Sequence, residues 1–258
     1  MIWIYLAFAS ALLSAFSTIL EKKVLFEEDA LDFSFKLSLL NLLLSIPFFF
    51  FFEIREIAIS SLLILFAKTV LSSLAFLNVM LMLKSFDISR SLPMMAITPA
   101  LVAVLAYFIV GDNLSVYDIS GIILLMVGTY MLEIKNGSKF LDPFVTIINS
   151  KAHRYIIYAL LLFTATAIMD RFLLVKHNMH PVALMSVQHI FIAFNFAVII
   201  LLKKRNPFKI ITSSRFSTLK LIMLISIVTI SYRWTNIEAV KLAPVPCDSP
   251  PGGRCQIR

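Results

Sequence analysis

The stretch IWIYLAFASALLSAFSTIL, residues 2–20, decides the fold class because it contains no charged side chain. A helix rises about 1.5 Å per residue, so about 20 residues cross a hydrocarbon layer of about 30 Å. No basic segment precedes the stretch, and Glu21, Lys22 and Lys23 follow it in place of a small-residue cleavage site. It is therefore predicted to be a true membrane span and not a cleaved signal peptide.

Apolar segments of similar length recur along the chain. Of the 258 residues, 60% are hydrophobic and only 15% are charged, whereas a soluble domain is about half apolar and about one quarter charged. The predicted fold class is an all-α polytopic membrane protein, located as a multi-pass protein in the cell membrane. Eight segments are predicted to span the bilayer, at residues 2–21, 34–52, 57–83, 88–110, 114–133, 154–174, 180–202 and 217–238.

The basic residues flank these segments. A net charge of +8 would also suit a nucleic-acid-binding protein, but Lys and Arg at the ends of spans follow the positive-inside rule. No nucleic-acid partner is therefore expected. The loops after the first, third, fifth and seventh segments are predicted to be cytoplasmic, since most basic residues are assigned to them, including Lys22, Lys23, Lys36, Lys84, Lys203, Lys204 and Arg205.

Two motifs occur twice at nearly the same separation. Residues 87–93 follow the pattern acid-x-x-base-x-x-Pro, and residues 238–244 repeat it 151 positions later. Residues 19–22, Ile-Leu-Glu-Lys, return as Ile-Met-Asp-Arg at 168–171, an offset of 149. The repeat unit is therefore predicted to contain five helices, and an odd number places the second copy in the membrane upside down, as in many secondary transporters.

The repeat predicts the organisation of the chain. Residues 1–135 form the first five-helix repeat, 136–152 the connecting loop, and 153–245 an incomplete second repeat. Residues 246–258 contain three prolines and two glycines, which no spanning helix tolerates. This tail is interpreted either as the result of a frameshift, altered splice or engineered scar, or as a short natural end. About eight helices of two inverted five-helix repeats would then be present.

Several short motifs resemble the drug/metabolite transporter superfamily, and in particular its EamA-like permeases. These are Arg90-Ser91-Leu92-Pro93 with Pro99 further on, and residues 110–115, which are similar to the Gly-Glu-x-Leu-Ser turn of the family with Asp112 in place of Glu. The third motif is the glycine-containing stretch 121–132. The resemblance covers residues 1–135 and about 153–245.

The resemblance implies a function and its partners. It implies a secondary transporter, not an enzyme, in which two inverted repeats surround a central cavity and carry a small polar metabolite by alternating access. The expected partners are a small-molecule substrate, the lipid bilayer, and a coupled proton or counter-substrate. A homo-oligomer is compatible with the sequence, and no cofactor is expected.

Lys68 is the clearest candidate for a functional residue. It lies well inside the third predicted span, where a charged side chain must face the bundle interior and find a partner. One interpretation is a contact to an anionic group of the substrate, and the other is a structural pair with a carboxylate of another helix.

Other polar residues within the spans are further candidates for substrate binding. Gln188 and Asn195 are seven apart and share a helical face, and His189 beside them could relay a proton. Asn41 lies at a matching depth in the second predicted span. Arg233 is predicted either to reach the interface past Trp234 or to point into the cavity opposite Lys68.

Two acid–base pairs end the first and sixth predicted spans. Glu21 with Lys22, and Asp170 with Arg171, are interpreted as interfacial salt bridges or as a gate that opens during transport. Two further residues, Pro93 and Pro99, should kink the fourth span. No metal site is expected, because His177 and His180 lack further ligands nearby.

Two alternatives to transport remain open at this point. The chain could be a non-transporting truncated fragment whose bundle lacks a wall. It could also be an intramembrane lipid-modifying enzyme, although its acidic residues are scattered along the sequence at Glu53, Glu56, Asp87 and Asp118.

Overall fold

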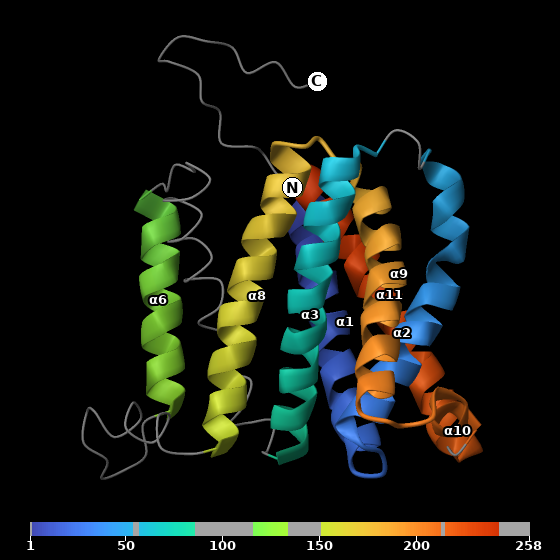
Figure 1. Cartoon of the computed structure of the whole chain (residues 1–258). Helices are drawn as coiled ribbons and strands as arrows, with labels where there is room; N and C mark the ends of the chain where they lie inside the picture. Colours follow the sequence, from blue (N-terminus) through green and yellow to red (C-terminus); the bar gives the residue numbers. More distant parts are fainter. Residues whose placement is uncertain (1, 54–56, 86–115, 134–150, 213–214, 243–258) are drawn as a thin grey trace.

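The computed structural model of the chain describes residues 2–53, 57–85, 116–133, 151–212 and 215–242. These residues form helices joined by short turns, and no strand is found in them (Figure 1). In chain order the helices are α1 (Ile2–Leu25), α2 (Ala30–Ser45), η1 (Ile46–Phe51), α3 (Ile59–Ser85), α6 (Val116–Glu133), α8 (Lys151–Val175), α9 (Pro181–Leu202), α10 (Pro207–Thr212) and α11 (Phe216–Leu242).

Six stretches of these helices are long and apolar enough to cross a membrane: Ile2–Leu25, Ala30–Phe51, Ile59–Ser85, Tyr155–Leu174, Pro181–Leu202 and Phe216–Asn236. The chain is therefore an all-α, multi-pass membrane protein, as predicted. Helix α6 matches the predicted segment 114–133 and contributes a shorter apolar stretch, Ile119–Gly128. The predicted span 88–110 lies outside the described residues, as do Pro93, Pro99 and the tail at 246–258.

Helix α2 begins four residues before the predicted segment. The Asp29 carboxylate accepts a hydrogen bond from the Leu31 N–H at 3.1 Å, which caps the helix and starts it at Ala30. The assignment of Lys36 to a loop was therefore wrong. Lys36 is buried within α2, and its Nζ lies 2.8 Å from Glu28 Oε2. A charged residue near a helix end is easily taken for a loop residue when hydropathy alone sets the boundary.

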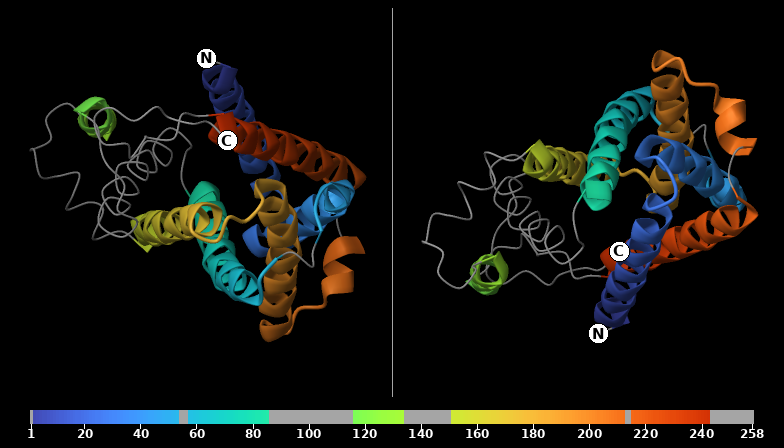
Figure 2. Two further views of the ribbon diagram at one scale, coloured as in Figure 1. Left: turned by 90° about the horizontal axis from the view of Figure 1, so that it is seen from above. Right: turned by 90° about the horizontal axis from the view of Figure 1, so that it is seen from below.

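The most extensive contacts join helices from different halves of the chain, and α2–α11 and α3–α9 contacts link the pairs named next. Helix α1 packs against α11, α3 against α8, and α2 against α9 (Figure 2). Following the chain colours in Figure 1, α1, α3 and α9 run one way, and α2, α8 and α11 run the other way. Suppose that α1 corresponds to α8, α2 to α9, and α3 to α11. Each helix then runs opposite to its counterpart, and the counterparts of two paired helices are again paired. Inverted repeats would produce this arrangement, and the repeat boundaries stay predictions.

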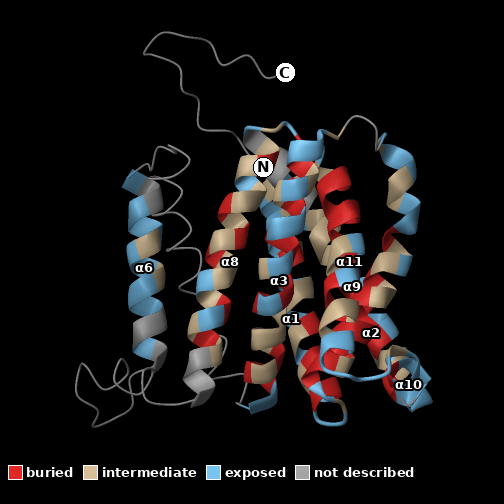
Figure 3. Cartoon of the chain, viewed as in Figure 1, coloured by how far each residue is buried: buried red, intermediate tan, exposed pale blue. Residues whose placement is uncertain are grey.

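Exposed and buried residues alternate along most helices of the bundle (Figure 3). Many of the exposed residues are large and apolar, whereas many polar ones are buried. Large apolar residues such as Phe8, Leu12 and Phe16 are exposed on α1, whereas Ser10 and Ser17 of the same helix are buried. This distribution suits lipid as the surrounding solvent, because hydrocarbon covers apolar surface and leaves polar groups to pair inside the protein.

Two apolar clusters fill the bundle at different heights along α3. One surrounds Phe33, Met80, Leu83 and Ile225, near the end of the bundle where α1 turns into α2. The other surrounds Leu65 and includes Leu173 and Val187. A group of polar side chains, which includes Lys68, follows Leu65 along α3, between these two clusters.

Charged side chains join the turns at the basic end of the bundle. Arg205 Nη1 lies 2.8 Å from Asp32 Oδ1 and 3.2 Å from Asp29 Oδ1, and Lys84 Nζ lies 3.9 Å from Asp29 Oδ2. Burial alone would raise the pKa of Asp29, but the hydrogen bond from Leu31 and the charges of Arg205 and Lys84 outweigh it and hold this pKa below its ordinary value. The hydrogen bond to Asp32 and its charge raise the pKa of Arg205.

The charges around Asp29 predict that the wild-type protein and the Asp29→Asn variant differ in stability by an amount that depends on pH. The pKa of Asp29 is lower in the folded than in the unfolded chain, so its ionised carboxylate stabilises the fold. This contribution is complete at pH values above the unfolded pKa of about 3.9. That contribution is lost as pH falls through the lower, folded pKa. Asp29→Asn keeps a capping oxygen but loses the charge, so it should cost about 0.5 kcal/mol near pH 7, the size expected for a half-exposed pair. Thermal unfolding in detergent should show the two proteins converging below about pH 4. A constant difference down to pH 3 would contradict this assignment.

Candidate functional site

Three helices bring charged and polar side chains together in the middle of the bundle. Lys68, the tenth residue of α3, is only 2% exposed. Its Nζ lies 2.8 Å from Oδ1 of Asp170 on α8 and donates a hydrogen bond to Oε1 of Gln188 on α9. The ammonium group therefore has one charged and one neutral partner, each from a different helix.

The pairing explains how a lysine is tolerated at this depth. An uncompensated charge inside the membrane costs several kcal/mol, and the Asp170 carboxylate and the Gln188 carbonyl offset that cost. Lys68 thus forms an ion pair with a carboxylate of another helix, and its contact to an anionic group of the substrate stays a prediction. The expected grouping of Asp170 with Arg171 did not anticipate this partner, because it considered only neighbours in the sequence. The Asp170 side chain is 34% exposed, so the pair is not fully enclosed.

Helix α9 presents a polar face to α3, as the spacing predicted. Gln188 and Asn195 are both buried, and Asn195 Nδ2 donates to Thr69 Oγ1 and to Ser73 Oγ, both at 3.4 Å. The sequence analysis did not identify Thr69 and Ser73 as partners, although their spacing of four residues places them on one face of α3. Together with Lys68 they make the α3–α9 contact polar along two helical turns.

His189 is the most deeply buried polar ring in the described part of the chain. It is 1% exposed, and neither Nδ1 nor Nε2 has a hydrogen-bond partner among the described residues. The Ser186 hydroxyl, also on α9, is in the same situation. A buried polar group without a partner costs about 1–3 kcal/mol. The charges of Arg233 and Lys68 both act on its ring.

A second set of polar residues lies where α1 meets α11. Glu21 is buried, and its Oε1 accepts a hydrogen bond from Ser17 Oγ at 3.1 Å. Arg233 on α11 exerts its charge on Glu21, and also on Lys68 and His189. Arg233 is half-buried and its Nε atom is buried, and its role in substrate binding stays a prediction. Lys22 donates to the backbone carbonyl of Leu83, so Glu21 and Lys22 have separate partners.

Asn41 joins two helices of the bundle. Its Oδ1 accepts a hydrogen bond from Ser226 Oγ at 2.7 Å, which joins α2 to α11. The sequence analysis matched Asn41 in depth with the α9 residues and did not consider Ser226, and a role of Asn41 in substrate binding stays a prediction. This bond is buried and holds two helices together, a typical role for amide and hydroxyl side chains in membranes.

The opposite end of the bundle holds a small cavity of about 160 Å³ between the turns that precede α3 and α9. Ser61 Oγ and His177 Nδ1 lie 2.9 Å apart in its wall, and Glu53 and His180 also line it. Throughout the described ranges, no three His, Cys, Asp or Glu side chains are grouped so that they could hold a metal ion.

Comparison with known proteins places the chain in a family. The search of curated proteins found no match. The family model described as the EamA-like transporter family matches residues 1–134, which is just over half of the 258 residues. The matched range carries α1, α2, α3 and α6, and with them Lys68, Asn41 and Glu21. The match also contains the motifs at Arg90–Pro93 and at 110–115, on which the resemblance rested. The chain belongs to the EamA-like transporter family.

Proposed function

We propose that this protein is a secondary transporter that moves a small, polar, anionic metabolite across the membrane by alternating access. Family membership supports membrane transport of the drug/metabolite type. The observation that carries the anionic class is the buried contact between Lys68 and Asp170 at 2.8 Å.

Lys68 is the group that can bind an anionic ligand. Lys68 and Arg233 supply two positive charges to the bundle interior, where Asp170 and the buried Glu21 supply two acids. His189 adds a ring whose nitrogens have no hydrogen-bond partner in the described structure. Asp170 is the counter-charge of Lys68 and is partly exposed. A carboxylate or phosphate of the substrate can therefore replace Asp170 beside Lys68, while Gln188 keeps the amine in place. The substrate then stabilises the state in which this exchange occurs.

The arrangement of helices supports alternating access. The pair α1–α11 corresponds to the pair α3–α8 in the inverted arrangement of helices. When two such pairs rock against one another, the Lys68 site can open to either side of the membrane. A proton or a counter-substrate would supply the driving force. His189 is the proposed group for a proton, since neither of its ring nitrogens has a hydrogen-bond partner among the described residues.

The test uses the full chain, purified and reconstituted into liposomes. A size-matched panel of a dicarboxylate (succinate), inorganic phosphate, a diamine (putrescine) and a neutral polyol (erythritol) is screened for thermal stabilisation. Radiolabelled compounds that stabilise the protein are then tested for counterflow. We expect only anions to bind and exchange, and an imposed pH gradient to change their initial rate if a proton is coupled. Binding restricted to the diamine or the polyol would refute the anionic class.

A further inference from the structure

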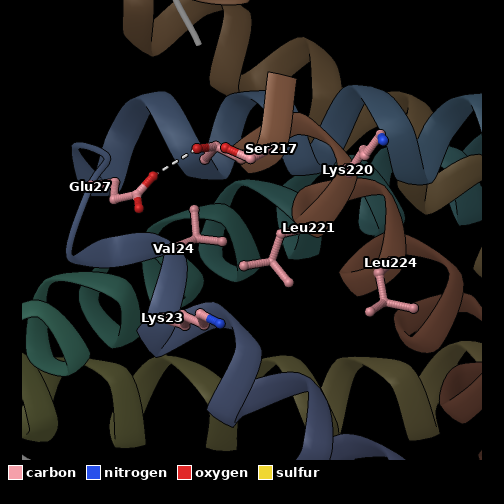
Figure 4. A pocket seen from close by; sticks show the side chains of 8 residues that line it. Lys23, Val24, Glu27, Ser217, Lys220, Leu221 and Leu224 are labelled. Atoms are coloured by element: carbon pink, nitrogen blue, oxygen red, sulfur yellow. Dashed lines mark hydrogen bonds between the residues drawn. The ribbon is translucent and has the colours of Figure 1, made fainter. Parts of the chain in front are cut away.

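A cavity of about 340 Å³ lies between the end of α1 and the start of α11, away from the Lys68 site (Figure 4). It is lined by Lys23, Val24, Glu27, Ser217, Thr218, Lys220, Leu221 and Leu224. None of these residues takes part in the proposed transport mechanism.

The lining combines a basic rim with an apolar floor. Lys23, Lys220 and Ser217 offer two ammonium groups and one hydroxyl, and Val24 and Leu221 lie between the two lysines in Figure 4. Glu27 is the one acid in the lining, and its Oε2 accepts a hydrogen bond from Thr218 Oγ1 at 2.8 Å. The cavity therefore holds two positive charges against one negative charge that already has a donor.

The cavity sits where two spans end. The apolar stretch of α1 ends at Leu25, and that of α11 begins at Phe216. Phe26 and Phe216 are both exposed there, and each has a lysine ammonium over its ring, Lys22 at 5.1 Å and Lys220 at 4.5 Å. Exposed aromatic rings and basic side chains at this level mark the interface between hydrocarbon and headgroups.

Apolar surface continues from the cavity floor along the outside of the bundle. Leu224 lines the cavity and is 42% exposed. Further along the same two helices, Ile227 of α11 and Phe16 and Ile19 of α1 are also exposed. A ligand with a negative head and long apolar chains would match both parts, whereas a small soluble anion would use only the rim.

We propose that this cavity is a binding site for an anionic phospholipid. The phosphate lies at the rim formed by Lys23, Lys220 and Ser217, and the acyl chains lie over Leu224 and the exposed faces of α1 and α11. The basic loops predict that this end of the bundle is cytoplasmic, where anionic lipids attract basic segments. The site is independent of the transported substrate.

The experiment compares lipid binding by the full-length protein and its variants in detergent. Phosphatidylglycerol, phosphatidylcholine and inorganic phosphate are each titrated, with thermal stabilisation and native mass spectrometry as the two readouts. The test variant is Lys23→Gln with Lys220→Gln. The matched control is Lys203→Gln with Lys204→Gln, which removes the same charge at the same end of the bundle but outside the cavity lining. Size-exclusion chromatography confirms that both variants are folded.

Phosphatidylglycerol should bind the wild-type protein and the control, and phosphatidylcholine should bind much more weakly. The test variant should bind phosphatidylglycerol roughly 30-fold more weakly, because each basic residue near an anionic lipid surface contributes about fivefold. Glu27→Gln should strengthen binding, since it removes the only negative charge of the lining. If the test and control variants lost phosphatidylglycerol affinity equally, the proposed binding site would be refuted. Stabilisation by inorganic phosphate as strong as that by phosphatidylglycerol would overturn the lipid as its ligand.

Discussion

Replacing Lys68 by Gln should abolish exchange of the anionic substrate and also destabilise the protein. The variant leaves Asp170 without its cation at 2.8 Å. Breaking a fully buried pair from one side costs roughly 3–5 kcal/mol, and the partial exposure of Asp170 reduces this to about 2 kcal/mol. Counterflow should fall at least about 100-fold, since a charge-assisted contact to the substrate is worth roughly 3 kcal/mol. Proteoliposome counterflow and thermal unfolding measure the two effects.

A double variant separates the effect on transport from the effect on stability. Lys68→Gln with Asp170→Asn removes both charges, and the two amides can hydrogen-bond to each other, so stability should return almost to the wild-type value. Transport should stay lost, because the anion contact is still missing. Recovery of transport in the double variant would show that Lys68 serves only to neutralise Asp170. Lys84→Gln, which changes an exposed lysine near the end of the same helix, should transport normally.

Replacing His189 by Leu should make the protein more stable and less active. Both ring nitrogens lack hydrogen-bond partners among the described residues, so an apolar side chain of similar size removes a cost and should stabilise the fold by about 1 kcal/mol. Transport should fall at least about tenfold, because the ring is proposed to bind the coupled proton during the transport cycle. Stability is measured by thermal unfolding in detergent, and transport by initial rates in liposomes.

Ser186→Ala provides the matched control for His189. Ser186 is a second polar group on α9 that is buried without a hydrogen-bond partner in the described structure. Its replacement should also be neutral or slightly stabilising, but transport should be unchanged. Loss of stability in His189→Leu would mean that the ring is an ordinary packing element, and the proposed role of His189 would then fail.

The helices were largely predictable, because hydropathy in a membrane protein is a strong local signal. The predicted segments 57–83 and 180–202 correspond to helices at Ile59–Ser85 and Pro181–Leu202. Their ends were harder to predict. Helix α1 continues through Lys22 and Lys23 to Leu25, because lysine forms helix well and its side chain can leave the hydrocarbon while the backbone stays helical.

The candidate site was predictable as a set of residues but not as a set of contacts. Lys68, Gln188 and Asn195 were identified because polar side chains at membrane depth are uncommon. Their partners were not, since the pairing of Lys68 with Asp170 depends on α3 packing against α8, across about 100 residues of sequence. The partner of Asn41 was not predicted for the same reason, because its bond to Ser226 depends on which helix lies beside α2.

The pairing of helices from opposite halves also sets the order of events during synthesis. Helix α3 enters the membrane before α8 exists, and 90 residues separate their ends, from Ser85 to Val175. At roughly 5–20 residues per second, Asp170 is synthesised about 5–20 seconds after Lys68. During this interval the insertion machinery, or another part of the new chain, must keep the ammonium group from lipid. The nascent protein is therefore most vulnerable to membrane quality control while its second half is still being translated.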